Sequence, residues 1–298
     1  MQSLEIGIDI GTTYVKTSNE RCFASGISDI VYPNNDILEI NGRKYTVGLK
    51  NISDININKS LNQNSRVNFL YALYLESTYS ENYFEEVTVG LPCSQWKNEK
   101  TVEHFKNTLL PENTIDIKLN NKSKRITVNS ISVVPEGSCA YYANDMNNFR
   151  FHKEKVLICD WGGRTLNTLL FENDDLIDTH TEELGVLSIY PKMAEKISTE
   201  TGISINNNQV FNIIKNGLYH KGKQIDIESY ISKIALEYCA EIYKIFQLQW
   251  NIDTIKFVPM IGGGSIIMTK YLQNYIPQAE LQPNAQLLTA IGMGEGVT

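Results

Sequence analysis

The sequence of 298 residues has few of the residues that form zinc sites, disulfide scaffolds or membrane spans. It contains four histidines and five cysteines, with no CxxC pair and no HExxH spacing, so we expect no zinc site. An odd number of cysteines, three of them in apolar stretches, favours reduced thiols and a cytoplasmic location. No apolar run approaches the roughly 18 residues of a membrane span. A strand expected from Leu4 leaves no room for a signal peptide.

Basic residues are outnumbered by acidic ones. Lys and Arg together number 27 against 34 Asp and Glu, which gives a net charge of −7. Such a chain is not expected to bind the phosphate backbone of nucleic acids directly. The most basic stretch, "KLNNKSKR" at 118–125, fits a hairpin that turns at Asn120 and Asn121 with its charges in solvent, and a binding patch is the alternative.

The remaining composition is that of a globular protein, with 42% hydrophobic and 20% charged residues, and the length suits two domains or one large one. Apolar runs predict strands at 4–10, 14–18, 86–92 and 255–261. Helical spacing predicts helices near 67–74, 94–109, 187–200, 208–216 and 226–250, with Ser94 as the cap of the second. Residues 33–62, rich in Asn, Asp and Ile, predict a small loop-rich insert that contains one short strand-like stretch, "RKYTVG" (43–48).

One pattern occurs twice, about half a chain apart. In "GIDIGTTYVKT" (7–17) and "ICDWGGRTLNT" (158–168), an apolar strand ends in an aspartate, a glycine turn follows, and a second strand begins. Such an internal duplication predicts equivalent turns on two domains. Each copy alone also fits an ordinary strand turn with a capped aspartate. Two copies in register, followed by the triple glycine at 262–264, favour a functional turn.

The residue types in these turns suit phosphate binding. Glycines let backbone amides approach phosphate oxygens without a Cβ clash. The hydroxyls of Thr12, Thr13 and Thr165 can donate to those oxygens, and Lys16 can neutralise their charge. An aspartate beside a phosphate requires a divalent cation between them, and Mg²⁺ is usually held through water. We therefore expect Asp9 and Asp160 to hold Mg²⁺.

These turns, together with "PEG" at 135–137 and "GGGS" at 262–265, resemble the actin, heat-shock-70 and sugar-kinase ATPase superfamily, and the motifs follow its order through the whole chain. The stretches "VTVGLPCSQW" (87–96), "VVPEGSCAYY" (133–142) and "CDWGGRTLNTLLF" (159–171) are most similar to the plasmid-segregating bacterial actins of the ParM and AlfA type.

The resemblance implies a duplicated α/β fold of the ribonuclease-H-like, actin-like kind, with a nucleotide cleft between two domains. Domain I would span 1–153, with a small insert at about 33–84 and the C-terminal helix 284–298 added to it. Domain II would span 154–283, with a helical subdomain at about 202–252.

The resemblance also assigns site residues. Catalytic roles fall to Asp9, Asp160 and Glu136, and Glu136 would orient the attacking water. Its alternative is an acid at a helix start, which the helix dipole would stabilise by roughly 0.3–1 kcal/mol. Nucleotide-binding roles fall to Gly11, Thr12, Thr13, Lys16, Gly162, Gly163, Thr165, Gly185, Lys215, Asn216, Gly262, Gly263 and Gly264.

Two positions depart from the family pattern. Trp161 replaces a small aliphatic residue, and it either packs behind its strand or contacts the nucleotide. Asn167 stands where related bacterial actins often have Asp.

By resemblance, the chain is expected to be a filament-forming ATPase that hydrolyses ATP or GTP with Mg²⁺. Its partners would be further copies of itself and a DNA-binding adaptor protein, through which it would segregate plasmid DNA. The alternative is a small-molecule kinase of the same superfamily. A kinase needs a base beside the acceptor hydroxyl, and the sequence shows no acid cluster typical of a sugar site.

Overall fold

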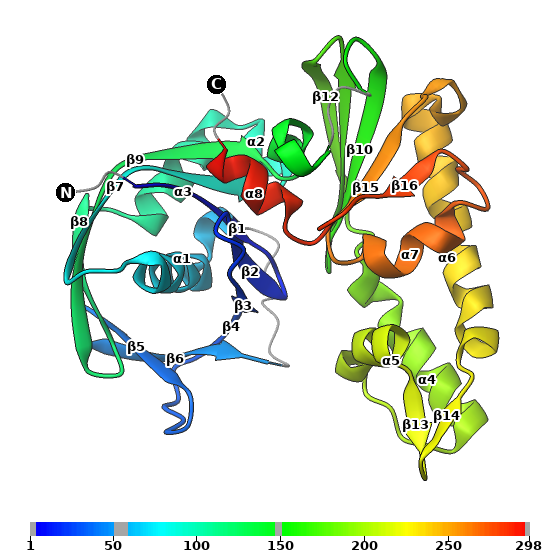
Figure 1. Cartoon of the computed structure of the whole chain (residues 1–298), viewed down its shortest axis with the longest axis horizontal. Coiled ribbons are helices and arrows are strands. Elements are labelled where there is room, and N and C mark those ends of the chain that lie inside the picture. Colours follow the sequence, from blue (N-terminus) through cyan, green and yellow to red (C-terminus); the bar gives the residue numbers. More distant parts are fainter. Residues whose placement is uncertain (1–3, 51–58, 147–150, 296–298) are drawn as a thin grey trace. The chain divides into compact units, whose positions relative to one another are not determined.

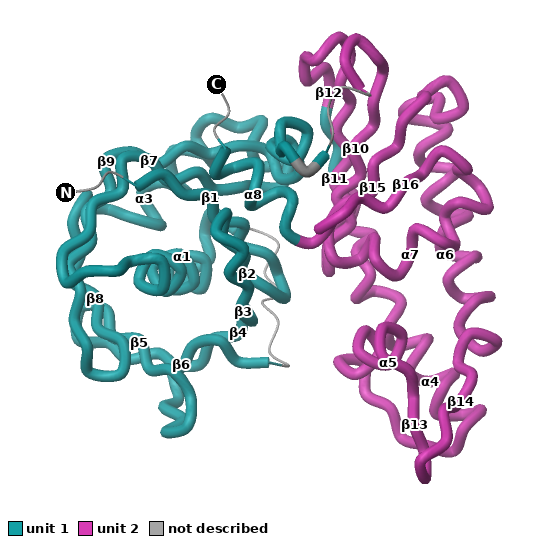
Figure 2. Tube along the Cα trace, in the orientation of Figure 1, with its two compact units in different colours: residues 1–148, 179–181, 287–298 teal, residues 149–178, 182–286 magenta. Residues whose placement is uncertain are grey.

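The computed structural model of the chain describes residues 4–50, 59–146 and 151–295. The chain divides into two compact units, drawn in two colours in Figure 2. Unit 1 comprises residues 1–148, 179–181 and 287–298, and unit 2 comprises residues 149–178 and 182–286. Each unit has its own sheet and its own hydrophobic core.

Unit 1 is built on a nine-stranded sheet in the order β3-β2-β1-β7-β9-β8-β5-β6-β4 (Figure 1). Its strands are β1 (Leu4–Ile10), β2 (Tyr14–Thr17), β3 (Cys22–Ala24), β4 (Gly26–Ser28), β5 (Asp36–Ile40), β6 (Arg43–Leu49), β7 (Glu81–Leu91), β8 (Thr114–Leu119) and β9 (Lys122–Pro135). Strands β1, β7 and β9 are parallel to one another, and the other pairs are antiparallel. The carboxyl ends of β1, β7 and β9 therefore meet at one edge of the sheet.

Helix α1 (Gln63–Glu76) lies within the curve of this sheet, as Figure 1 shows. Every residue from 67 to 74 is buried, so side chains on every side of this part of the helix face the core. A helix that is apolar all round is a buried helix. The other helices of unit 1 are α2 (Cys93–Trp96), α3 (Glu99–Leu109), α8 (Leu288–Gly294) and the 3-10 helices η1 (Lys59–Leu61), η2 (Ser138–Tyr142) and η3 (Asn144–Met146).

The C-terminal helix α8 packs closely on β1 and η2, and glycines make that approach sterically feasible. A Cβ at Gly7 would lie 2.4 Å from Cβ of Met293, and a Cβ at Gly292 would lie 2.0 Å from the carbonyl oxygen of Cys139. Real Cβ atoms do not approach other atoms this closely, so glycine is required at both positions. Helix α8 thus supports the strand and the turn that carry the candidate site residues of unit 1.

Unit 2 is built on a five-stranded sheet in the order β12-β11-β10-β15-β16. Its strands are β10 (Lys155–Trp161), β11 (Leu166–Glu172), β12 (Asp175–Glu182), β15 (Val258–Ile261) and β16 (Ala279–Leu281), although residues 179–181 of β12 are counted with unit 1. A separate hairpin joins β13 (Leu218–His220) to β14 (Lys223–Ile225). Its helices are η5 (Val186–Ser188), α4 (Tyr190–Thr201), η6 (Asn207–Gln209), α5 (Val210–Asn216), α6 (Glu228–Trp250), η7 (Ile252–Thr254) and α7 (Ser265–Leu272). The buried side chains of α6 recur at helical spacing, as in Ile231, Ala235, Ile242 and Phe246.

Most predicted elements are confirmed, including both hairpins with glycine turns, the helices at 67–74 and 226–250, and the hairpin at Asn120 and Asn121, whose φ angles are 47° and 70°. The five cysteines are free, and four of them are buried. No helix of the described residues is both long enough and apolar enough to cross a membrane.

Two local predictions are wrong. Ser94 is not a cap: α2 starts after Pro92, and Asn98 caps α3 by accepting from the amide of Thr101. A helix does follow Glu136: it is the short 3-10 helix η2, whose N-cap is Gly137 with φ of +86°. Within the insert, the strand-like stretch 43–48 is confirmed as β6, but residues 36–40 form a second strand, β5, rather than loop, and 51–58 lie outside the described residues.

Candidate nucleotide-binding site

The turn between β1 and β2 is a tight hairpin. The amide of Gly11 donates to the carbonyl of Tyr14 (3.0 Å), which leaves Thr12 and Thr13 as the two loop residues. A Cβ at Gly11 would lie 2.6 Å from the Tyr14 oxygen. Ser25 donates hydrogen bonds to both loop carbonyls. Its hydroxyl donates to the carbonyl of Thr12 (2.5 Å), and its amide donates to the carbonyl of Thr13 (3.0 Å). No protein acceptor among the described residues takes the hydroxyl of either threonine, so both suit a ligand.

Asp9 is buried directly opposite Lys16 in the β1–β2 pair. The ammonium of Lys16 donates to Oδ2 of Asp9 over 2.6 Å. Burial alone would raise the pKa of Asp9, but the charges of Lys16 and Lys59 and the hydrogen bond from Lys16 outweigh it, so the pKa lies below its usual value. The aspartate is therefore an anion held at the end of the strand.

Glu136 follows β9 at the same sheet edge, and its amide donates to the carbonyl of Leu91 (2.8 Å). Its carboxylate is buried and forms an ion pair with Lys59 of η1. The same ammonium donates to the carbonyl of Ile10 (2.5 Å). Unit 1 thus brings Asp9, Lys16, Lys59 and Glu136 to one edge. Sequence reasoning missed Lys59, because it lies in a polar stretch with neither periodicity nor motif.

The hairpin between β10 and β11 repeats the first one. The amide of Gly162 donates to the carbonyl of Thr165 (2.9 Å), at the same offset from Asp160 as the Gly11 bond has from Asp9. The loop residues are Gly163 and Arg164, so Thr165 corresponds to Tyr14 rather than to a loop threonine. Asn167 lies opposite Asp160, where the first hairpin has Lys16.

Gly185 packs against this second hairpin. Its amide donates to the carbonyl of Arg164 (2.7 Å), and the amide of Leu187 donates to that of Gly163 (2.8 Å). A Cβ at Gly185 would lie 2.2 Å from the carbonyl carbon of Arg164. A side chain at 185 would therefore separate the two segments.

Trp161 is fully buried, so of its two expected roles the packing behind the strand is confirmed. Its indole nitrogen donates to the carbonyl of Leu184 (2.9 Å), and its ring lies 6.2 Å from that of Tyr238. The hydroxyl of Tyr238 donates to the carbonyl of Gly185 (3.2 Å). The two aromatic residues therefore fix the segment that packs against the hairpin.

The triple glycine after β15 closes on Asp160. Gly262 has φ of +84°, and a Cβ there would lie 2.4 Å from Oδ1 of Asp160. The amide of Gly264 donates to the carbonyl of Trp161 (2.7 Å), and a Cβ at Gly264 would lie 2.7 Å from that oxygen. Gly263 differs, because a Cβ there would meet only the side chain of Gln286 at 3.9 Å. Two of the three glycines are thus required by the fold of unit 2 itself.

Lys215 and Asn216 are exposed at the end of α5, just before Gly217. The side-chain amide of Asn216 donates to Asn212 one turn earlier (2.5 Å). Helix α5 contacts α7, which begins directly after the triple glycine. Neither side chain bonds to the glycine segments among the described residues, so their assignment to the base and ribose remains a proposal.

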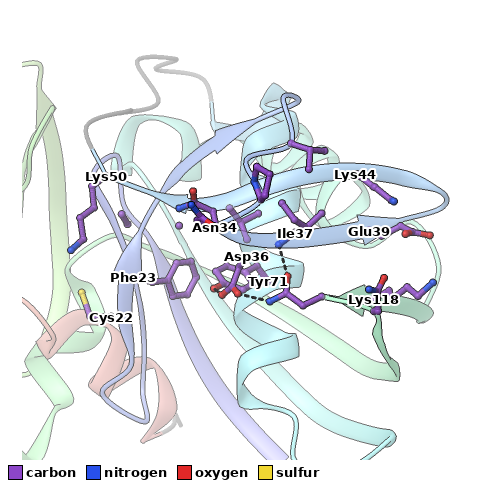
Figure 3. A pocket seen from close by; sticks show the side chains of 18 residues that line it. Cys22, Phe23, Asn34, Asp36, Ile37, Glu39, Lys44, Lys50, Tyr71 and Lys118 are labelled. Atoms are coloured by element: carbon purple, nitrogen blue, oxygen red, sulfur yellow. Dashed lines mark hydrogen bonds between the residues drawn. The ribbon is translucent and has the colours of Figure 1, made fainter.

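A polar cavity of about 920 Å³ lies elsewhere in unit 1 (Figure 3). None of the predicted site residues lines it. Asp36 on its wall accepts from the hydroxyl of Tyr71 (2.6 Å) and from the amide of Asn120 (2.6 Å). Phe23 packs edge-on against Tyr71 with ring centres 4.8 Å apart. The cavity is therefore distinct from the hairpin edge.

Asp9 and Asp160 suit Mg²⁺ better than a metal ion that is bound by protein side chains alone. The described residues contain no group of three or more His, Cys, Asp and Glu side chains able to hold a metal ion. Mg²⁺ keeps several waters and binds through one or two carboxylates plus substrate phosphates. Asp9 and Asp160, each at a strand end beside a tight turn, fit this mode.

Comparisons with known proteins identify the family and the fold of the chain. The family model for the N-terminal domain of actin-like proteins matches residues 7–138, and that for the C-terminal domain of the archaeal MreB-like actin homologue matches residues 158–274. No curated protein sequence matches the chain. The two models follow one another over most of the chain, which belongs to the actin-like superfamily.

Solved structures share the fold at low identity. The archaeal actin homologue Ta0583 is 16% identical, with a TM-score of 0.80 over 98% of both chains, and Ta0583 has also been solved in complex with ADP. A ParM in a 15-stranded filament from Clostridium botulinum is 18% identical, with a TM-score of 0.77 over 99% of both chains. A non-polymerisable mutant of the ParM from pCBH is 19% identical, with a TM-score of 0.76 over 99% of this chain and 98% of that one. The two-domain actin-like α/β fold is therefore confirmed.

Proposed function

We propose that this protein is a nucleotide-dependent, filament-forming ATPase that segregates plasmid DNA through a DNA-binding adaptor protein. The observation that carries the proposal is the repeated hairpin. Each copy has an aspartate at the end of a strand and a glycine amide bonded to the carbonyl three residues on. A turn of this kind exposes donors to phosphate beside an acid that suits hydrated Mg²⁺.

In this proposal the first hairpin provides the hydroxyls of Thr12 and Thr13 and the charge of Lys16 to the phosphates. Glu136, at the same sheet edge, accepts a hydrogen bond from the attacking water and orients it. Asp9 and Asp160 would hold Mg²⁺ through water, and the ion would supply positive charge beside the phosphate oxygens.

The second unit supplies the rest of the nucleotide site. Gly162, Gly163, Thr165 and Gly185 bring main-chain atoms towards the phosphates. Gly262, Gly263 and Gly264 let a flat ring lie against the backbone, while Lys215 and Asn216 face the base and ribose. The complex of Ta0583 with ADP supports a nucleotide as ligand of this fold, and GTP is the alternative to ATP.

Different observations support the two proposed partners, further copies of the chain and a DNA-binding adaptor. Structures of a ParM filament and of an Alp12 filament share this fold with the chain. The net charge of −7 is unsuited to direct contact with the DNA backbone, which favours recognition through a basic adaptor. Filament growth would then move the adaptor together with the DNA.

The proposal is tested by right-angle light scattering of the purified protein at tens of micromolar, with Mg-ATP, Mg-GTP or no nucleotide. We expect scattering to rise with one Mg-nucleotide only, while phosphate is released from the same sample. A flat trace with every nucleotide, together with nucleoside diphosphate formation that requires an added sugar and releases no free phosphate, would instead establish the small-molecule kinase.

A further inference from the structure

Lys59 contacts two elements that the proposed site needs. Its ammonium donates to the carbonyl of Ile10, the last residue of β1, and forms an ion pair with Glu136, the residue after β9. The side chain is largely buried, with 13% of its surface exposed, and that of Glu136 is 8% exposed. Its charge also helps to lower the pKa of Asp9.

The strand order explains why such a link is useful. Strands β1 and β9 lie on either side of β7, so their ends are separated by two strand spacings, about 10 Å. Lys59 reaches across the end of β7 from η1, which is not part of the sheet. Lys59 thereby holds the Glu136 carboxylate near Ile10, the last residue of β1, where the proposed phosphate-binding hairpin begins.

We propose that Lys59 is a positioning residue for hydrolysis, which holds the Glu136 carboxylate towards the hairpin of β1 and β2. The inference rests on the proposed function, because Glu136 acts on water only if the chain hydrolyses a nucleotide. A glutamate side chain has three rotatable bonds, and a single buried cation that also bonds a main-chain carbonyl removes most of that freedom. The cation also offsets the cost of burying the carboxylate.

A positioning role predicts a specific kinetic signature. Lys59→Met keeps the length and volume of the side chain but removes the charge. We expect its kcat to fall at least tenfold, because Glu136 loses its direction, while KM for the nucleotide stays within about twofold. Removing a residue that acts only in the transition state lowers kcat and kcat/KM together.

A double-variant cycle separates action through Glu136 from direct action on phosphate. If Lys59 acts through Glu136, then Glu136→Gln and the double variant Lys59→Met/Glu136→Gln hydrolyse at the same reduced rate. If Lys59 contacts the nucleotide itself, the two losses multiply. The double variant removes both charges of the Lys59–Glu136 ion pair, so the comparison holds even where Lys59→Met alone does not fold.

Lys124→Met is the matched control. Lys124 is a half-buried lysine of the same unit, and it also bonds main-chain carbonyls, those of Tyr74 and Ser77. We expect its variant to lose thermal stability without a change in kcat.

The experiment is steady-state phosphate release and nucleotide binding by all variants, with wild-type light scattering recorded alongside. A wild-type rate for Lys59→Met, a loss of nucleotide binding, or multiplied losses in the double variant would overturn the positioning role. None of these results affects the proposed function as long as the wild-type protein hydrolyses nucleotide and scatters light. If the wild-type protein does neither, the proposed function fails first.

Discussion

The hairpins β1–β2 and β10–β11 share one backbone design but differ in charge. Both place a glycine amide two residues after an aspartate and bond it to the carbonyl three residues on. In the first, Lys16 faces Asp9, whereas in the second Asn167 faces Asp160. The duplicated part is therefore the turn, and the charge around it has diverged.

The surroundings of the two aspartates differ in the same way. In unit 1, Lys16, Lys59 and Glu136 lie near Asp9, so ion pairs hold the side chains at this sheet edge. In unit 2, the backbone at Gly262 packs directly against the Asp160 carboxylate, so close backbone packing shapes this sheet edge. We infer that unit 1 supplies the chemistry of the proposed reaction and that unit 2 mainly supplies shape.

The largest effect is expected at Glu136. Glu136→Ala should lower hydrolysis by about 100-fold or more, in line with losses of positioned acid–base groups. Nucleotide binding and filament growth should stay nearly intact, so light scattering should rise normally. It should then remain high, because hydrolysis is proposed to drive filament disassembly. Paired scattering and phosphate-release traces on one sample measure both. A variant that hydrolyses normally would return Glu136 to the role of a structural acid.

Asp9 and Asp160 should respond alike despite their different neighbours. Residues that hold a metal through outer-shell contacts typically contribute about 10–100-fold to its affinity. Asp9→Ala and Asp160→Ala should each raise the Mg²⁺ concentration for half-maximal hydrolysis by that factor, with the fold preserved in circular dichroism. An unchanged Mg²⁺ requirement in either variant would remove that aspartate from the metal site.

The glycines of unit 2 allow a matched pair of variants. Gly262→Ala places a side chain at φ of +84° and against Asp160, so we expect it to lose about 1–3 kcal/mol of folding free energy and about tenfold in nucleotide affinity. Gly263→Ala meets only Gln286 at 3.9 Å and should change neither by much. Urea unfolding and nucleotide titration measure the two quantities. Equal behaviour of the two variants would contradict the close packing on Asp160.

The smallest effect concerns acid stability. Because folding lowers the pKa of Asp9, the Asp9–Lys16 pair stabilises the fold above the ordinary aspartate pKa of about 3.9, and this stability is lost as the pH falls through the lowered pKa. We expect about 1 kcal/mol, the usual size of a net hydrogen-bond contribution. Asp9→Asn should therefore have a shallower decline of unfolding free energy below pH 4. A decline as steep as in the wild type would assign the acid sensitivity to other carboxyl groups.

Local features were the ones that the sequence could predict. The hairpins follow from glycines and short loops, the turn at Asn120 and Asn121 from the tolerance of Asn for positive φ, and α6 from its 3.6-residue spacing. All of these are decided by residues that are close together in the chain.

Features set by distant residues could not be predicted. Lys59 pairs with Glu136 across 77 positions, and no local pattern distinguishes it from other polar residues of its stretch. Strand β5 at 36–40 lies in a stretch rich in Asn and Asp, and its pairing with β6 and β8 fixes it instead. The placement of the C-terminal helix was expected only from the resemblance, since its glycine contacts with β1 and η2 are made by residues far apart in the chain.

The central claim is that both hairpins bind the same nucleotide, and hydrogen exchange tests it most directly. The amides of 9–16 and of 160–167 should be followed by mass spectrometry with and without Mg-nucleotide. Because each turn is proposed to contact the phosphates, exchange should slow in both segments at the same nucleotide concentration. Protection of one segment alone, or of both at clearly different concentrations, would contradict a shared site.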